Sequence, residues 1–446
     1  MDVAVVAAVP PIRGAAAGPI KILSALTGWT VRAALCPRLD QPGTNNLSTR
    51  LYLVDRAERR PQERGRIRSS RMDDQPQLPL IVGAGPTGLA AALFLADGGV
   101  RSRIIDRALL PSTTSRAQVV NPRTLELLET TGVSAAILAE ARPIHRVLFY
   151  EGWEPLAKLE FRDAHPRFPM SVIPQARTEA LLCSALAERQ IVPERGVELV
   201  TFSQDADGVD AQLARVGQKE VARAPLMFCA DGAHSNVRAV LGIELEGSGF
   251  PEAWPLYDLE LDDPLDLDSA HVSFVPGGMV FLLCLHPGHW RVFGNVPDLL
   301  ARLPPRSNPG EIGWESSFHI DDRVASREVV GRVALAGDAA HIHAPVAARG
   351  MNLGIEDAFV FANCAVDVLD GDVNRMADYG ELRHAVHKQV VGRIDKLTRL
   401  ARGQPDLVAV LRHYLIPGMT AFWPTRDAMI DLVTGLDHDI RTELPQ

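Results

Sequence analysis

The chain has 446 residues, of which 46% are hydrophobic and 23% charged, a composition typical of a globular protein with room for two domains. The formal net charge of −9 gives no support for nucleic-acid binding, which normally requires a basic surface. No run of about 18 uncharged apolar residues occurs, so the sequence predicts no membrane span.

Positive charge is concentrated at the N-terminus. Residues 1–71 carry 12 basic and 5 acidic side chains, and the rest of the chain carries 34 and 50. Residues 1–75 are rich in Ala and Pro and then in Arg, with no sustained period after about residue 35, which predicts a disordered leader. Three interpretations stay open: a transit peptide, a basic interaction arm, or translated upstream DNA before a start at Met72.

The first nucleotide-binding signal is a short apolar strand at residues 78–82, a glycine turn, and an Ala/Leu-rich helix at residues 89–96. In the turn, Gly83 permits the tight bend, Gly85 lets the backbone approach a pyrophosphate, and Gly88 lets the helix pack close to the strand. The helix N-terminus then faces the phosphates. The turn as a whole predicts contacts to a dinucleotide from Gly83, Ala84, Gly85, Pro86, Thr87 and Gly88.

A second strand is predicted at residues 100–105 and ends at Asp106, 23 positions after Gly83. A carboxylate at about this distance accepts hydrogen bonds from ribose hydroxyls, and the adjoining Arg107 is a further candidate contact. The fingerprint does not choose between NAD and FAD. It occurs once, because Gly247-Ser-Gly249 lacks the third glycine.

Two later segments repeat the pattern of a strand that ends in a polar turn. The first runs from Pro225 into Asp231 and Gly232, with Ser235 placed to cap the helix that comes next. The second ends at Gly337 and Asp338, whose carboxylate can accept the hydrogen of a ribityl hydroxyl.

With these segments in order behind the fingerprint, the chain resembles the class A FAD-dependent flavoprotein monooxygenases, the family of para-hydroxybenzoate hydroxylase, phenol hydroxylase and the aromatic polyketide hydroxylases. The resemblance covers about residues 78–385. It implies an α/β fold: a Rossmann-like FAD-binding domain of the GR2 type, with an inserted β-sheet substrate domain and C-terminal helices. The motifs that carry it are the opening glycines, residues 115–128, residues 173–179, Asp231-Gly232, and Gly337 through Asp357.

The same resemblance implies roles for individual residues. Arg116 would lie near the flavin and its phosphates, Gln175 would contact the cofactor, and Asp338 would bind the ribitol. Asp231 and Gly232 would lie by the pyrophosphate and the path of NAD(P)H, which docks transiently in this family.

A segment from Pro345 to Asn352 would lie along the flavin ring. A helix that begins near Gly350, Met351 and Asn352 would direct its positive end at the flavin and stabilise the reduced anion. Where the family usually has Pro-x-Gly-Gly-Gln-Gly, this chain has Pro345-Val-Ala-Ala-Arg-Gly350. The two alanines narrow the backbone freedom beside the ring, and Arg349 places a cation there for a reduced flavin or an acidic substrate.

Residues 146–172 and 246–325 are β-rich and predict one substrate-binding sheet. The FAD-binding domain is predicted at residues 76–145, 173–245 and 326–375, and a C-terminal helical region at residues 376–446. Candidate contacts for a phenolic proton are His271, His286, His289 and Tyr257, although a strand histidine is more often a surface or core residue.

The sequence gives little support for a catalytic side-chain set or a metal site. No catalytic residue set is compelling, and His341 and His343 are poor metal ligands by their spacing, so no metal is expected. Met419, Phe422 and Trp423 are candidate core or dimer contacts, which leaves monomer or homodimer open. The dispersed cysteines favour a reducing compartment, and we predict the cytoplasm; they are Cys36, Cys183, Cys229, Cys284 and Cys364.

The sequence therefore predicts an FAD-dependent monooxygenase that uses NAD(P)H and O2, through a C4a-hydroperoxyflavin, to oxygenate an electron-rich, aromatic or polyketide-like small molecule. Two alternatives stay open. One is a reductase or dehydrogenase of the same fold, and the other is a non-catalytic flavin- or ligand-binding relative.

Overall fold

The computed structural model describes residues 77–112, 117–262, 265–404 and 406–444. The predicted leader, residues 1–75, and the candidate Arg116 lie outside these described residues. The described residues all belong to one compact unit. Within the described part, no helix is both long and apolar enough to cross a membrane.

A six-stranded sheet lies at the centre of the nucleotide-binding fold. Its strand order is β18-β19-β12-β1-β2-β8, and every neighbouring pair is parallel except β18 with β19. The carboxyl ends of the parallel strands therefore share one edge, where ligands bind in open α/β sheets. The strands are β1 (Leu80–Val82), β2 (Arg103–Asp106), β8 (Glu194–Arg195), β12 (Met227–Cys229), β18 (Val329–Val330) and β19 (Val333–Leu335).

Both faces of this sheet are buried, which explains why its strands are apolar runs. Ile81, Ile104 and Phe228 belong to the core that the helices cover. Leu80 and Met227 belong to a separate core on the other face. The predicted order of strand, glycine turn, helix and second strand is confirmed.

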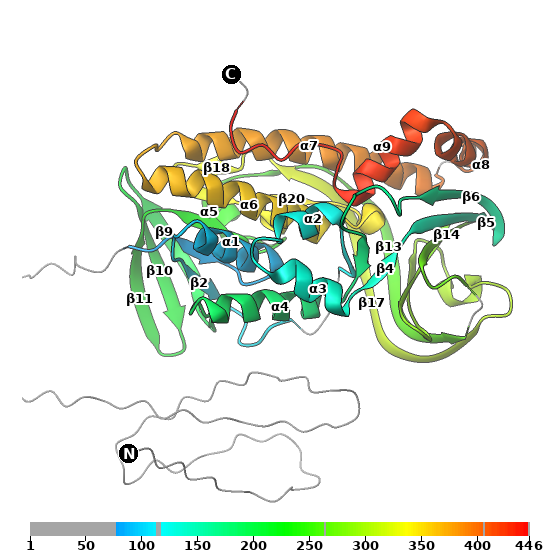
Figure 1. Ribbon diagram of the computed structural model, residues 1–446, viewed down its shortest axis with the longest axis horizontal. Helices are drawn as coiled ribbons and strands as arrows, with labels where there is room; N and C mark the ends of the chain where they lie inside the picture. Colours follow the sequence, from blue (N-terminus) through cyan, green and yellow to red (C-terminus); the bar gives the residue numbers. More distant parts are fainter. Residues whose placement is uncertain (1–76, 113–116, 263–264, 405, 445–446) are drawn as a thin grey trace, which may run out of the picture. The chain divides into compact units, whose positions relative to one another are not determined.

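The helices on the first face pack closely. Helix α1 contacts both α4 and α6, and α6 runs beside α7 (Arg375–Arg402) (Figure 1). A methyl group at Gly88 would lie 1.9 Å from the carbonyl oxygen of Gly83, so only glycine permits this distance between helix and strand. The helices of this part are α1 (Pro86–Asp97), α2 (Pro122–Leu127), α3 (Val133–Glu140), α4 (Gln175–Glu188), α5 (Asn236–Val240) and α6 (Gly350–Leu369).

A small antiparallel sheet covers the second face. Its order is β11-β10-β9, and the buried Val209, Ala211 and Leu213 alternate with more exposed residues along β10. This sheet was not predicted from the sequence, although its period of two was visible. Its strands are β9 (Glu198–Gln204), β10 (Val209–Arg215) and β11 (Gln218–Ala224).

The predicted substrate-binding sheet is an eight-stranded sheet with the order β20-β17-β13-β16-β15-β14-β5-β6. As predicted, β5 and β6 come from the earlier β-rich segment and β13 to β17 from the later one. The strands are β5 (Arg146–Glu151), β6 (Glu154–Glu160), β13 (Leu245–Asp262), β14 (Ser269–Val275), β15 (Gly278–His286), β16 (His289–Gly294), β17 (Asn308–Ala325) and β20 (His341–Ile342).

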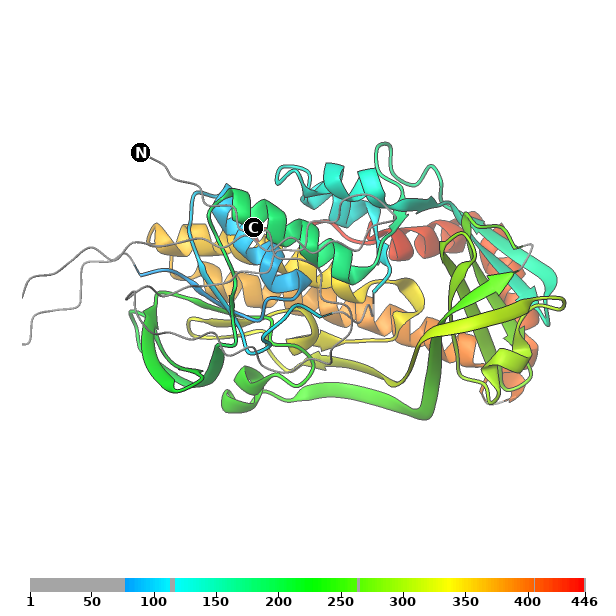
Figure 2. The same cartoon turned by 90° about the horizontal axis from the view of Figure 1, so that it is seen from below.

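Two long strands of the eight-stranded sheet, β13 and β17, extend back toward the nucleotide-binding fold. β13 and β17 pair antiparallel from Leu245 opposite Ala325 to Asp262 opposite Asn308, with register shifts on the way. Gly247 has a φ of +138°, and a methyl group there would lie 2.1 Å from the carbonyl oxygen of Asp322. Figure 2 shows β13, in green, running along one side of the molecule toward the other strands of the eight-stranded sheet. Only the later part of β13 was recognised as a strand from the sequence.

The pleat of β15 and β16 separates two sets of side chains. Phe281, Leu283 and Phe293 belong to a core that helices of the C-terminal region also contribute to. Leu282 and Trp290 belong to a core on the opposite face. A fourth sheet has three strands in the order β3-β7-β4. They are β3 (Val119–Val120), β4 (Arg142–Ile144) and β7 (Met170–Val172).

The C-terminal region is helical, as predicted. It contains α7 (Arg375–Arg402), α8 (Asp406–Ala421) and α9 (Trp423–Thr434). Met419 packs against the core that includes Phe293, whereas Phe422 and Trp423 are 59% and 65% exposed. A dimer contact through these two aromatic residues stays a prediction, as do the domain boundaries.

Candidate functional site

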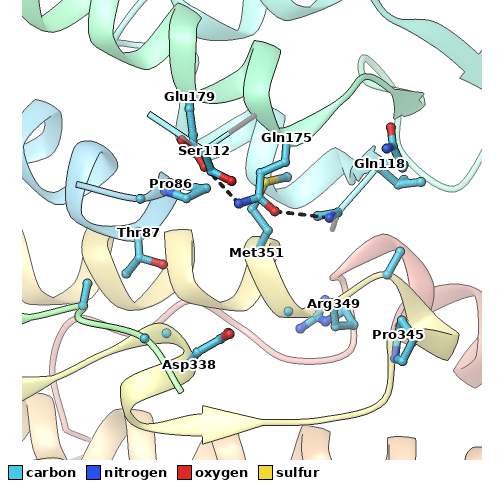
Figure 3. A pocket seen from close by; sticks show the side chains of 18 of the residues that line it. Pro86, Thr87, Ser112, Gln118, Gln175, Glu179, Asp338, Pro345, Arg349 and Met351 are labelled. Carbon is cyan, nitrogen blue, oxygen red and sulfur yellow. Dashed lines mark hydrogen bonds between the residues drawn. The ribbon is translucent and has the colours of Figure 1, made fainter. Parts of the chain in front are cut away.

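A cavity of about 690 Å³ extends from the glycine turn to the eight-stranded sheet. Residues far apart in the chain line it, and Figure 3 shows those from the start of α1, the segment around Asp338 and the start of α6. Strands β2, β15 and β16 also contribute lining residues. The predicted site residues that line it are Ala84, Gly85, Pro86, Thr87, Asp106, Gln175, Gly232, Gly337, Asp338, Pro345, Arg349, Gly350 and Met351.

The glycine turn leaves room for a ligand at one position only. A methyl group at Gly85 would meet nothing within 4 Å, whereas at Gly83 it would lie 2.2 Å from the carbonyl oxygen of Ala230. Gly85 is the N-cap of α1 and no side chain caps this helix. The positive end of α1 is therefore presented to the cavity, as an anion site requires. Gly83 and Gly88, which were also predicted to contact the dinucleotide, do not line the cavity, because both pack against backbone atoms and shape the turn.

Asp106 is held in place at the cavity wall. One carboxylate oxygen accepts a hydrogen bond from the backbone N–H of Ala84 at 2.8 Å, and the other accepts one from Ala108 at 2.7 Å. Arg195 donates to the same carboxylate at 3.1 Å and itself lines the cavity. Arg107 is exposed and does not line the cavity, although the next residue, Ala108, does.

Gln175 begins α4 and lies between two partners (Figure 3). Its side-chain oxygen accepts a hydrogen bond from the N–H of Ala117 at 3.2 Å, and its nitrogen donates to Glu179 at 2.9 Å. Glu179 also lines the cavity, and burial raises its pKa. Neither Arg195 nor Glu179 was assigned a role from the sequence. Arg195 lies outside every motif, and Glu179 ends the motif of residues 173–179, in which only Gln175 was assigned a contact.

The turn at Gly337 touches the glycine turn of α1. Gly337 has a φ of +55°, and a methyl group there would lie 2.8 Å from the Oγ1 of Thr87. Its N–H donates to a carboxylate oxygen of Asp357 in α6 at 2.9 Å. Asp338 comes directly after it, is exposed and lines the cavity, where Figure 3 shows its carboxylate.

The first turn of α6 points its N-terminus at the cavity without a side-chain cap. Ala348, just before it, has a φ of +52° and a ψ of 34°, which is the left-handed region where glycine is favoured. The family's usual Pro-x-Gly-Gly-Gln-Gly places a glycine at this position. The sequence predicted that the two alanines restrict the backbone here. In the structure, this restriction falls on Ala348, which is held in a conformation that is unfavourable for alanine.

The position of Asn352 differs from the expectation that it lies along the flavin ring. It does not line the cavity, because its side chain is used by the backbone around it. Its amide oxygen accepts from the N–H of Asn121 at 3.1 Å, and its nitrogen donates to the carbonyl oxygens of Val119 and Ala348 at 3.0 and 2.7 Å. Asn352 therefore fixes the first turn of α6 and does not offer its side chain to a ligand.

The surroundings of Arg349 also differ from the expectation. The guanidinium was expected to serve a reduced flavin or an acidic substrate, but it is fully buried and lies 3.3 Å from a carboxylate oxygen of Glu356 and 3.3 Å from one of Asp437. Two carboxylates thus match its charge. The positive field at the start of α6 comes from the helix backbone.

Asp231 likewise does not line the cavity, although its neighbour Gly232 does. One carboxylate oxygen of Asp231 accepts from the N–H of Val237 at 3.3 Å, which helps to cap α5. Ser235 caps the same helix by accepting from Arg238 at 3.0 Å, as predicted.

A buried network surrounds Asp357. Its carboxylate accepts hydrogen bonds from His341 at 2.9 Å, His387 at 2.7 Å and Arg383 at 2.7 Å. Burial disfavours the charged form of His387, but Asp357 and Glu328 outweigh it and raise the pKa of His387 to about 9. His341, His387 and Arg383 thus surround the buried carboxylate of Asp357 in one network of hydrogen bonds and ion pairs.

None of the four side chains expected to contact a phenolic proton lines the cavity. His271 is buried against Tyr150 and the carbonyl oxygen of Asp266, and Tyr257 packs on the opposite face of the sheet. His286 and His289 lie at the hairpin between β15 and β16. The sheet instead presents Phe281, Leu283, Arg291 and Phe293.

A family model described as an FAD binding domain matches residues 79–280 and 296–394. The chain belongs to this FAD-binding family. The enzyme 6-methylpretetramide 4-monooxygenase of Streptomyces rimosus is 36% identical over 321 residues, which cover 67% of this chain and 57% of that protein. Pentachlorophenol 4-monooxygenase of Sphingobium chlorophenolicum is 32% identical over 302 residues, which cover 63% and 56%. The chain therefore spans less than two thirds of the length of either relative.

The fold of this FAD-binding protein also matches solved flavin hydroxylases. The crystal structure of aklavinone-11 hydroxylase with FAD and aklavinone gives a TM-score of 0.66 at 25% identity, covering 75% of this chain and 70% of that one. The predicted fold class and cofactor are confirmed.

The cavity residues fit FAD. The uncapped end of α1, with open space at Gly85, suits the pyrophosphate, and Asp106 suits the adenosine ribose. Asp338 suits the ribityl chain, and the uncapped start of α6 suits the flavin ring. These individual contacts are our assignments.

Gly85→Ala should weaken FAD binding about tenfold or more without unfolding the protein, because the added methyl group enters the open space meant for the pyrophosphate. The dissociation constant of FAD, measured by quenching of flavin fluorescence, checks this. Gly88→Ala is the matched control and should lower the melting temperature of the apoprotein, since its methyl group meets Gly83. Equal loss of stability in both variants would contradict the assignment of Gly85.

Ala348→Gly should raise the free energy of unfolding by about 1 kcal/mol, because glycine adopts the left-handed conformation without strain. Ala347→Gly should lower the free energy of unfolding. Ala347 lies in a 3₁₀ turn that relieves no strain when it becomes glycine, and glycine loses more conformational entropy on folding than alanine. Denaturant unfolding of the two apoproteins measures both changes. A stabilising effect at residue 347, or a destabilising one at residue 348, would count against the strain.

His387 should make stability depend on pH in the alkaline range. The pKa in the folded protein, about 9, is above the usual value of 6.5, so the stabilisation is complete below about pH 6.5 and is lost as the pH rises through 9. The loss should be on the order of 3 kcal/mol. His387→Gln should have a flatter stability profile between pH 6 and 10, and identical profiles would show that His387 is not charged.

Proposed function

We propose that the protein is an FAD-dependent monooxygenase that hydroxylates an electron-rich, aromatic or polyketide-like small molecule. The observation that carries this proposal is the continuity of one cavity from the start of α1 to the apolar wall of β15 and β16. A cofactor bound along the first part would place its ring against that wall, where a flat apolar substrate would bind.

The relatives support this reaction class. Their names describe monooxygenases that act on 6-methylpretetramide and on pentachlorophenol. They are longer than this chain, so activity and substrate are proposals here.

The parts of this chain have separate tasks in the reaction. FAD, when bound, supplies hydride acceptance from NAD(P)H and activation of O2. Phe281, Leu283 and Phe293 exclude water from the reacting end of the cavity. The backbone N–H groups at the start of α6 stabilise negative charge nearby.

The overall reaction is balanced: the substrate C–H, O2, NAD(P)H and one proton give the substrate C–OH, NAD(P)+ and water. NAD(P)H supplies two electrons, one oxygen atom enters the product, and the other becomes water. The described residues contain one nucleotide-binding sheet of this type, in agreement with an NAD(P)H that binds only transiently. A cytoplasmic location and a monomeric or homodimeric state complete the proposal.

Two alternatives predict different outcomes. A reductase or dehydrogenase of the same fold would oxidise NAD(P)H or substrate without inserting oxygen. A non-catalytic relative would bind FAD and leave NAD(P)H untouched; the strained Ala348, where the family usually has glycine, motivates it.

The purified protein, loaded with FAD, should oxidise NADH or NADPH faster when a phenolic substrate is added. With labelled O2, the product should gain one labelled oxygen atom by mass spectrometry. Oxidation of NAD(P)H with no label in the organic product would favour the reductase. A yellow protein that never oxidises NAD(P)H would favour the non-catalytic relative, and failure to bind FAD would overturn the whole scheme.

A further inference from the structure

Arg291 is an unusual residue in the substrate wall. Among the described residues of the eight-stranded sheet, it is the one ionisable side chain that lines the cavity, between Leu283 on β15 and the aromatic side chains of Phe281 and Phe293. Its side chain is 3% exposed. A buried charge in an apolar wall costs free energy unless it is paired. In ligand pockets, such isolated polar groups orient the ligand and provide specificity.

A neighbouring strand holds the guanidinium in one orientation. Asp258 on β13 lies directly opposite Arg291 in the register and forms a bidentate ion pair, with both nitrogen–oxygen distances 2.7 Å. The guanidinium also lies 5.2 Å from the ring centroid of Trp314, which is opposite Asp258 on β17. Leu283, Arg291, Asp258 and Trp314 thus form one row across four strands.

This pair is not needed to hold the sheet together. The next row on the same face is apolar, with Phe281 opposite Phe293 and Leu256 beyond it. A buried ion pair adds little net stability compared with well-packed apolar residues, so a further apolar row would serve the fold as well. The arrangement instead resembles a binding group: a planar donor oriented by a carboxylate behind it.

We propose that Arg291 binds the ionised hydroxyl of a phenolic substrate and thereby selects hydroxyaromatic compounds that bind as phenolates. This inference rests on the proposed function. The guanidinium donates hydrogen bonds to the phenolate oxygen, the phenol's proton passes to water, and no electrons move in this step. The aromatic ring packs against Phe281 and Phe293. A phenolate ring is richer in electrons than the phenol, which suits the oxygenation proposed above.

The test compares 4-nitrophenol with 4-nitroanisole, in which a methyl group replaces the acidic proton. Binding to the FAD-loaded protein is measured without NAD(P)H by flavin fluorescence, and the visible band of the phenolate reports the ionised fraction. The wild-type protein should bind 4-nitrophenol about tenfold or more tightly than 4-nitroanisole and should increase the phenolate band. The double variant Asp258→Asn/Arg291→Met should lose this preference and should still bind FAD.

The variants are chosen so that a folding defect does not hide the result. The double variant removes both charges together and leaves none unpaired in the wall. Arg291→Lys keeps the charge but not the bidentate geometry and should retain part of the preference. Arg323→Met is the matched control, because Arg323 forms an ion pair with Asp321 on β17 and does not line the cavity. It should behave like the wild type.

The proposal is overturned if the wild-type protein binds both probes equally or binds neither, or if the double variant keeps the preference for 4-nitrophenol. Its failure can be told from failure of the proposed function. A holoenzyme that oxidises NAD(P)H and inserts oxygen, but has no preference for the phenolate, rejects only the role of Arg291. A holoenzyme that prefers the phenolate without inserting oxygen rejects the monooxygenase and keeps the binding site.

Discussion

The buried carboxylate of Asp357 is the contact on which the rest of the site depends. It lies on α6 and accepts a hydrogen bond from the N–H of Gly337, which immediately precedes Asp338. It also binds Arg383 and His387 of α7 and His341 of β20. One carboxylate therefore positions the turn assigned to the ribityl chain, the helix assigned to the flavin ring, and the helix behind them. Because Asp357 is fully buried, its charge is tolerated only while these donors remain in place.

This network determines where positive charge is available near the flavin. Arg349 and Arg383 carry full charges, but Glu356, Asp357 and Asp437 face them inside the protein. The cavity therefore receives little net charge from these arginines. The backbone N–H groups at the starts of α1 and α6 also present partial positive charge to the cavity, because neither helix has a side-chain cap. Backbone donors keep a fixed geometry and do not titrate, which suits a cofactor whose own charge changes during turnover.

Most of the residues that the sequence assigned to the cofactor line the cavity, because the signals that mark them are local. Gly85, Asp106 and Gly337 each lie at or just after the end of a strand, so a short motif fixes both their conformation and their place at the carboxyl edge of the sheet. Asn352 and Arg349 show the limit of this reasoning. A motif places the residue near the flavin, but the direction of its side chain depends on partners such as Val119 and Asp437, which lie far away in the chain.

The substrate half could not be predicted in the same way, because it depends on the register between strands. Arg291 and Asp258 are 33 positions apart and meet only because β13 and β16 pair with these two residues opposite each other. A shift of one residue would turn Arg291 to the far face and bring Trp290 or Val292 to the cavity. The alternation of Trp290 and Val292 with Arg291 and Phe293 was the available signal: one charge on an apolar face. The strand histidines were chosen as candidates because imidazole can accept a proton. The pleat of the sheet, however, determines which side chains face the cavity.

The two halves of the cavity also rest on different cores. The glycine turn packs in the core of α1, α4 and α6, and the substrate wall packs in the core that β15 and β16 share with α7 to α9. Side chains on the wall can therefore change without disturbing the packing of the cofactor turns. The long strands β13 and β17 limit this independence, because they pair along both regions and a register change in either would move the wall relative to the flavin. Substrate selectivity is thus free to vary at single positions such as Arg291, while the alignment of the wall with the cofactor is fixed by backbone pairing.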